Sequence, residues 1–344
     1  FRVNMAGDLN ANSVTISGVA LTTIGTFGGN GADGALSISL GTTTVDLGGA
    51  QIYTLNYESI SITGTAKLAF SNPHANGTIV IIKSQGAITI SSTQPGIDVS
   101  SLGAAGGANT NDGENGNNPT GMLVSTDTPR GGGAGAQGTS GPAGTALTNT
   151  EFYSTAEYKL HKKAVFLVCG AGGASGEKAS AAGNGDNSNA TGGRGGGALF
   201  IECGGALNFT GTITASGQVG GNGNTDDVDS GGGGGGGGRG MVVILYNSLT
   251  ANTGTITTAG GVGGTGGECT AGSGGGTPGG GGGGAGSLDA AGGDGGAADV
   301  TGSNGGTGAG GGGGGGRNTV GAALAGGTAG ASAGGLVVEN KYFA

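Results

Sequence analysis

The chain has 344 residues, of which 93 are glycine, and its formal net charge is −9. Collagen is excluded, because the glycines follow no strict Gly-X-Y period and only six prolines are present. A helical bundle is excluded, because glycine costs about 1 kcal/mol per helix position relative to alanine. With 21 Asp and Glu against 12 Lys and Arg, the charge has the wrong sign for a nucleic-acid partner. No apolar run approaches the ~18 residues of a membrane span.

The first 100 residues are predicted to form short strands. They contain 14 glycines, against 39 in residues 251–344. Apolar and polar residues alternate with period two, and Gly, Asn and Pro separate the runs, which is typical of strands joined by turns. The predicted strands cover residues 35–40, 44–47, 59–63, 68–70, 78–83, 87–90 and 96–99.

Beyond residue 100, apolar runs alternate with glycine tracts and repeat. Ala198–Cys203 aligns with Met241–Tyr246 at an offset of 43 residues, and Gly211–Thr214 aligns with Gly254–Thr257 at the same offset. Further copies of the leading run are residues 78–83, 164–169 and 335–339. One such unit cannot bury its own apolar face, whereas stacked units bury a continuous one.

This repeat predicts an all-β fold: a parallel β-helix or β-solenoid, a stack of short strands with glycine-rich excursions. A β-sandwich with decorated loops is the alternative. We expect two regions, a strand-rich region at residues 1–100 and a glycine-rich repeat region at residues 101–344 that ends in a strand.

The long glycine tracts are residues 231–238, 279–284 and 310–316. They could be solvated flexible linkers. They could also form extended polyglycine II helices, which resemble polyproline II and have no internal hydrogen bonds. Without Cβ atoms, such helices can approach and hydrogen-bond one another, so we expect a rigid bundle with polar loop tips.

Glycine tracts between short apolar strands, as in residues 231–240 before Met241, resemble the polyglycine II sandwich adhesins at the tips of phage long tail fibres. The resemblance covers roughly residues 100–335 and lies in composition and layout. Residues 53–57 and 60–64 are also similar to glycine-rich β-solenoid surface and tail proteins of bacteria and phages. Such adhesins usually carry aromatic loop tips, and the tracts after residue 250 have none.

The densest acidic group of the predicted loop tips is Asp226, Asp227 and Asp229. Carboxylates at this spacing could hold Ca²⁺, although the order of an EF-hand and the nonapeptide of calcium β-rolls are both missing. A solvated acidic tip is the alternative. We expect no other metal and no cofactor.

Catalytic motifs are sparse. The histidines are His74 and His161 alone, and residues 138–142 end in proline where a nucleophile elbow needs glycine. No phosphate-binding loop with Gly-Lys-Ser/Thr occurs. We therefore expect a protein that is not an enzyme.

Two segments are candidates for contacts between subunits. Residues 150–163 contain no glycine and carry Phe152, Tyr153 and Tyr158 beside a basic end, so they form either a subunit contact or a cap on the solenoid. The second segment is the C-terminal strand, whose candidate contact residues are Leu336, Val337, Val338, Tyr342 and Phe343. It can pair with its own sheet, with residues 14–21, or with the edge of a neighbouring chain.

Cys169 and Cys203 close two copies of the repeated run. They either form a disulfide or remain two buried thiols, and an odd total of three cysteines is no disulfide framework.

Together these features predict a non-enzymatic extracellular structural protein, a subunit of a self-assembling fibre or cell-surface filament. The alternative is a receptor-binding adhesin of a phage tail fibre or cell surface, which recognises a glycan or an outer-membrane protein through its loop tips. We expect self-association into a homo-oligomer or filament, and a location on the cell surface or virion.

Overall fold

The computed structural model describes residues 27–108, 114–119, 131–133, 141–144, 167–176, 190–223, 232–266, 280–284, 286, 292–293, 305–306, 308, 311–313 and 325–328, and the backbones of five further strands. All regular structure in these residues is β-strand. The strands are β1 (Arg2–Val3), β2 (Leu9–Asn10), β3 (Thr15–Ile16), β4 (Val19–Ala20), β5 (Ala35–Ile38), β6 (Thr42–Asp46), β7 (Ile52–Tyr57), β8 (Ser59–Ile62), β9 (Lys67–Ser71), β10 (Ile79–Ser84), β11 (Ile88–Ile90), β12 (Pro95–Asp98), β13 (Ala198–Phe209), β14 (Thr212–Thr214), β15 (Met241–Asn252), β16 (Thr255–Thr257) and β17 (Leu336–Glu339).

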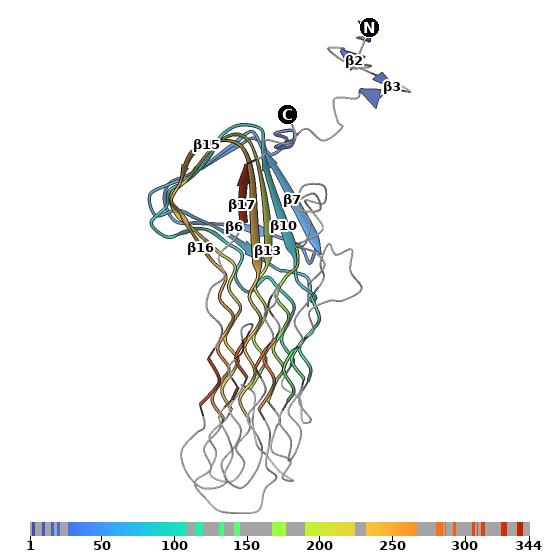
Figure 1. The fold of residues 1–344 in the computed structure, drawn as a ribbon, viewed down its shortest axis with the longest axis vertical. Helices are drawn as coiled ribbons and strands as arrows, with labels where there is room; N and C mark the ends of the chain where they lie inside the picture. Colours follow the sequence, from blue (N-terminus) through green and yellow to red (C-terminus); the bar gives the residue numbers. More distant parts are fainter. Residues whose placement is uncertain are drawn as a thin grey trace, which may run out of the picture.

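The strands from β5 onward stack in three columns, and every pairing among them is parallel. The first column contains β7, β10, the first halves of β13 and β15, and β17. The second contains β5, β8, β11 and the second halves of β13 and β15. The third is a separate five-stranded sheet of β6, β9, β12, β14 and β16. We call these columns together the strand stack (Figure 1).

The register of the strand stack confirms the 43-residue repeat. Ala198 pairs with Met241, and Cys203 pairs with Tyr246. In the third column, Ile213 pairs with Ile256 at the same offset. The all-β prediction is therefore confirmed, with parallel sheets that draw strands from both sides of residue 100.

The main core lies between the columns, because alternate residues of each strand point inward. In the second column, Leu36, Ile60, Ile88, Leu207 and Leu249 follow one another in register. The three middle residues of this ladder are at most 3% exposed, whereas Leu249 at one end is 46% exposed. Burial is thus complete inside the stack and incomplete at its ends.

One predicted strand copy, residues 164–169, differs from the structure. Its described part does not join a column, because β13 pairs directly with β10. Leu167 and Cys169 instead belong to a second apolar cluster with Ile79 and Phe200, which alternate with residues of the main core along β10 and β13. This segment therefore covers the outer face of the first column.

The predicted C-terminal strand is present as β17, and it pairs with β15 of its own sheet: Leu336 lies opposite Val243. Residues 14–21 do not provide its partner, since β3 and β4 pair with each other in antiparallel orientation. Because no strand follows β17 in the described part of the sheet, β17 forms its edge.

The glycine-rich segments all leave the stack at the same corner. They follow the third-column strands β12, β14 and β16, and they lead back to the first-column strands β13, β15 and β17. In Figure 1 the described segments run side by side away from the strands. We call the described residues between Gly103 and Thr328 that lie outside the strands the glycine array.

Candidate functional site

The glycine array is held together by hydrogen bonds between backbones. In tract 232–240, the amides of Gly234, Gly237 and Gly240 all donate to the neighbouring tract 215–223, at N···O distances of 2.8, 2.9 and 2.8 Å. Every third residue of the tract therefore faces the same neighbour.

The other amides of tract 232–240 face different neighbours. Gly235 and Gly238 donate to tract 170–176, and Gly236 donates to Gly312. The carbonyl oxygens of the tract accept from three further segments, at residues 193–196, 261–264 and 281–284. The tract thus has six hydrogen-bonded neighbours, three that accept and three that donate, and residues 232–238 are buried.

The array requires glycine because there is no space for a Cβ atom at these positions. A Cβ atom on Gly237 would lie 2.0 Å from the carbonyl oxygen of Arg194, and one on Gly235 would lie 2.1 Å from that of Gly282. Left-handed backbone is not the reason, because the described glycines with positive φ all lie at or before Gly77. At these glycine positions the tracts approach so closely that a Cβ atom does not fit between them.

Arg194 joins the array to the strand stack. Its Nε donates to the carbonyl oxygen of Gly103 (3.1 Å) and its Nη2 to that of His74 (2.5 Å). Its own carbonyl oxygen accepts from the amide of Gln218 at 2.7 Å. Burial lowers the pKa of the Arg194 guanidinium, opposed by the nearby Cys169.

The ends of the tracts remote from the strands mark the predicted loop tips. Tract 215–223 follows β14 and runs outward, whereas tract 232–240 runs back to β15. The linking residues, which include Asp226, Asp227 and Asp229, lie outside the described residues, as do Phe152, Tyr153, Tyr158, Tyr342 and Phe343. The calcium site and most of the predicted subunit contacts therefore remain predictions. Of these candidates, Leu336, Val337 and Val338 are placed by their backbones, in β17.

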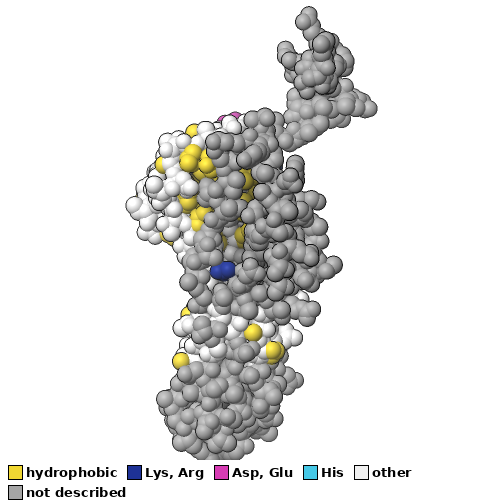
Figure 2. All heavy atoms as spheres, viewed as in Figure 1, with side chains coloured by type: hydrophobic (Ala, Val, Ile, Leu, Met, Phe, Trp, Pro, Cys, Tyr) yellow, Lys and Arg dark blue, Asp and Glu magenta, His cyan; other side chains and the backbone are white. Residues whose placement is uncertain are grey.

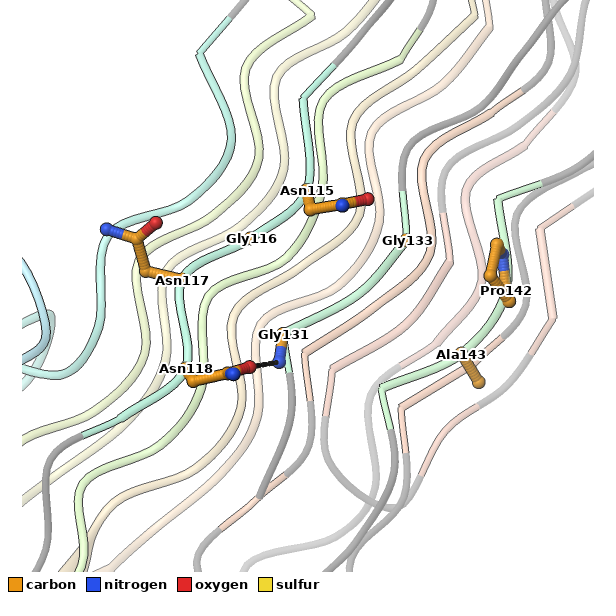
Figure 3. Close-up of a pocket in the computed structure, with 8 residues that line it drawn as sticks. All are labelled: Asn115, Gly116, Asn117, Asn118, Gly131, Gly133, Pro142 and Ala143. Atoms are coloured by element: carbon orange, nitrogen blue, oxygen red, sulfur yellow. Dashed lines mark hydrogen bonds between the residues drawn. The ribbon is translucent and has the colours of Figure 1, made fainter. Parts of the chain in front are cut away.

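An open groove on the side of the array carries exposed amide side chains (Figure 3). Asn115, Asn117 and Asn118 line one part of it, and Pro142 and Ala143 line another. The Oδ1 of Asn118 accepts from the amide of Gly131 at 2.9 Å, which fixes that side chain. The Nδ2 of Asn117 donates to the carbonyl oxygen of Ala75 at 3.4 Å. Amide groups beside a small apolar surface suit a polyhydroxyl ligand such as a sugar.

Cys169 and Cys203 are buried free thiols, so the disulfide alternative is not what the structure shows. The Sγ of Cys169 donates to the carbonyl oxygen of Thr78 at 3.3 Å. Burial raises the pKa of Cys169 to about 12, and burial also raises the pKa of Cys203. The two residues lie in different apolar clusters on opposite faces of the first column. Neither thiol has the environment of a reactive cysteine.

Sequence reasoning missed Arg194 and the asparagine groove. Arg194 is a single charged residue inside a glycine run, and its partners lie 91 and 120 residues away. Three asparagines within residues 115–118 were a visible signal for the groove, but their apolar neighbours come from a separate segment.

Comparison with known proteins supplies no relative: no protein family, curated protein or solved structure matches the chain. Within the part of the chain that the structure describes, no group of three or more metal-binding side chains occurs. Over the same residues, no helix has the length and apolar character needed to cross a membrane.

Proposed function

We propose that this chain is a non-enzymatic, extracellular structural protein, a subunit of a self-assembling fibre or cell-surface filament. In this proposal the strand stack is a β-solenoid and the glycine array is a polyglycine II bundle. The observation that carries the proposal is the set of six hydrogen-bonded neighbours around tract 232–240.

The three-residue period of these bonds supports the polyglycine II assignment. A polyproline II-type helix has three residues per turn and no internal hydrogen bonds, so successive amides point in three directions. Gly235, Gly236 and Gly237 donate to three different segments in this way. These three glycines do not adopt the left-handed backbone conformation, since the described glycines with positive φ all lie at or before Gly77.

Such a bundle suits a mechanical role. Its cohesion comes from backbone groups that are bonded to one another rather than from side chains. A buried, bonded backbone is also a poor protease substrate, because cleavage needs a locally open chain. On the face seen in Figure 2, charged side chains of the described residues are sparse, and hydrophobic side chains gather over the strand region.

Electron microscopy of the purified chain over a range of concentrations tests the proposal. We expect long polymers built from one kind of subunit. A chain that stays monomeric, or that forms only discrete oligomers, at all concentrations would overturn the filament.

A second candidate function is an adhesin that recognises a glycan, and the asparagine groove favours it. Binding of the wild-type chain to immobilised glycans, lost in Asn117→Ala and kept in the surface control Gln94→Ala, would support it. Gln94 is an exposed amide residue of the strand stack, between β11 and β12. No glycan binding by the wild-type chain would remove this candidate.

A further inference from the structure

Among the described residues, the strands at the two ends of the strand stack carry few of the features that usually protect a sheet edge. Exposed edges of natural sheets carry charges, prolines or bulges that prevent pairing with another chain. At one end lie β5 and β6, whose single charged residue is Asp46. Asp46 accepts hydrogen bonds from the Gly48 amide (2.9 Å) and from the Asn72 side chain (2.9 Å). Two donors of its own chain therefore stabilise the charge of this carboxylate.

The opposite end is formed by β17 in the first column, where Glu339 is the one charged residue, and by two segments in the other columns, the second half of β15 and β16. Residues 247–266, which include both, contain no charged residue and no proline. Leu249 is 46% exposed here, whereas its neighbour in the ladder, Leu207, is fully buried. Leu249 is exposed because, among the described residues, no strand follows β15 in the second column.

The residues at the two ends of the strand stack belong to the same ladders of paired residues. Leu36 begins the inward ladder of the second column that Leu249 ends. In the third column, Thr255 and Thr257 pair with Thr212 and Thr214 of the preceding strand. β6 offers the same Thr-x-Thr pattern at the other end, in Thr42–Asp46. All pairings within the strand stack are parallel, so a second copy in the same orientation would extend each column without a change of direction.

We propose that these ends form a head-to-tail seam between copies of this chain, in which β5 and β6 of one copy pair in parallel with β15 and β16 of the next. In this seam Leu36 lies opposite Leu249, and Thr42 and Thr44 lie opposite Thr255 and Thr257. The seam buries the exposed side chains and pairs the free strand edges. It rests on the proposed function, since it supplies the contact along the filament. A heterologous contact of this kind generates an open polymer when the rotation does not close.

The first column takes a smaller part in the seam. At the β7 edge, the backbone amide of Asn56 donates to Oδ2 of Asp33 at 2.6 Å, and its carbonyl oxygen accepts from the amide of Asp33 at 2.8 Å. These bonds occupy the edge of β7 at that point. The second and third columns therefore carry the pairing.

Two variants block one end each. Leu249→Lys places a charge in the seam at the β15 end. Thr44→Pro removes an outward amide at the β6 end: Leu47 donates to Ser71 of β9 at 2.9 Å, and alternation along the strand directs the Thr44 amide away from β9. Val219→Lys is the matched control, because Val219 is 56% exposed but lies in the glycine array.

Sedimentation velocity and electron microscopy provide the readout, and circular dichroism checks that each variant folds. We expect each blocked variant to be monomeric alone, with at least a tenfold loss of polymer, and Val219→Lys to polymerise like the wild type. A 1:1 mixture of the two blocked variants should give dimers, because each supplies the end that the other lacks. Normal polymers from folded Leu249→Lys would overturn the seam while leaving the filament intact. Absence of polymers from the wild type would overturn both proposals.

Discussion

Arg194 reaches out of the glycine array and donates from its Nη2 to the carbonyl oxygen of His74 in the strand stack, at 2.5 Å. Its Nε donates to Gly103 at the same time. One side chain therefore joins the glycine array to the strand stack, beside the side-chain hydrogen bonds from Asn117 to Ala75 and from Cys169 to Thr78.

Replacing Arg194 by methionine should destabilise the chain by about 1–3 kcal/mol, because two carbonyl oxygens lose a buried donor. The control is Lys83→Met, which removes a partly exposed ion pair with Glu202 (3.3 Å) and should cost at most about 1 kcal/mol. Urea unfolding followed by circular dichroism measures both. Equal losses in the two variants would contradict the joining role of Arg194.

Substitution of Gly237 by alanine should cost about 3 kcal/mol or more, because the added methyl group would lie 2.0 Å from a backbone oxygen that cannot move freely. Gly49→Ala is the comparison. Nothing lies within 4 Å of its added Cβ, and its φ of +73° accounts for a cost of about 1–2 kcal/mol. Thermal unfolding of both variants measures the two losses of stability. A Gly237→Ala chain as stable as Gly49→Ala would show that the tracts are not closely packed.

Acid should weaken the third column through Asp98. Burial alone would raise its pKa, but the ion pair with Lys67 and hydrogen bonds from Ser100 and Thr214 outweigh burial, so the pKa lies below its ordinary value of 3.8. A lowered pKa means that the folded chain binds fewer protons than the unfolded chain. The stabilisation from Asp98 is therefore complete above about pH 4 and is lost as the pH falls through the folded-state value.

The Asp98→Asn variant tests this dependence. Its free energy of unfolding should be lower than that of the wild type at pH 6, and the difference should shrink between pH 4 and pH 2. Urea unfolding at several pH values gives the curve. A difference that stays constant across this range would mean that Asp98 does not carry the effect.

The thiols of Cys169 and Cys203 should not react with iodoacetamide in the folded chain at pH 8, because both are buried with raised pKa values. A Cys269→Ser background removes the third cysteine from the assay. Mass spectrometry should find two labels after denaturation and none before. Rapid labelling of the native chain, or a disulfide between the two, would contradict their placement.

Part of this fold could be predicted from the sequence. The 43-residue offset places Ala198 opposite Met241 because parallel strands in successive turns of one column keep a common register. The same reasoning failed at Leu167 and Cys169, since their apolar run has the composition of a first-column strand. Composition cannot show that the position beside β10 is already taken by β13.

The site was harder to predict than the strands. That glycine backbones bond one another follows from their composition, but which tract meets which does not. The amide of Gly236 donates to the carbonyl oxygen of Gly312, and neither residue has a side chain from which this pairing could be predicted. The seam was equally hidden, because Leu36 and Leu249 differ from other strand leucines only in their place at the ends of the stack.

Hydrogen exchange at the amides of residues 232–240 tests the central claim most directly. In the structure, Gly234 to Gly238 and Gly240 each donate to another segment of the chain. We expect these amides to exchange at least about a thousandfold more slowly than an unstructured glycine peptide, as slowly as the amides of β13. Exchange at the unstructured rate in a chain whose β13 amides stay protected would contradict the account.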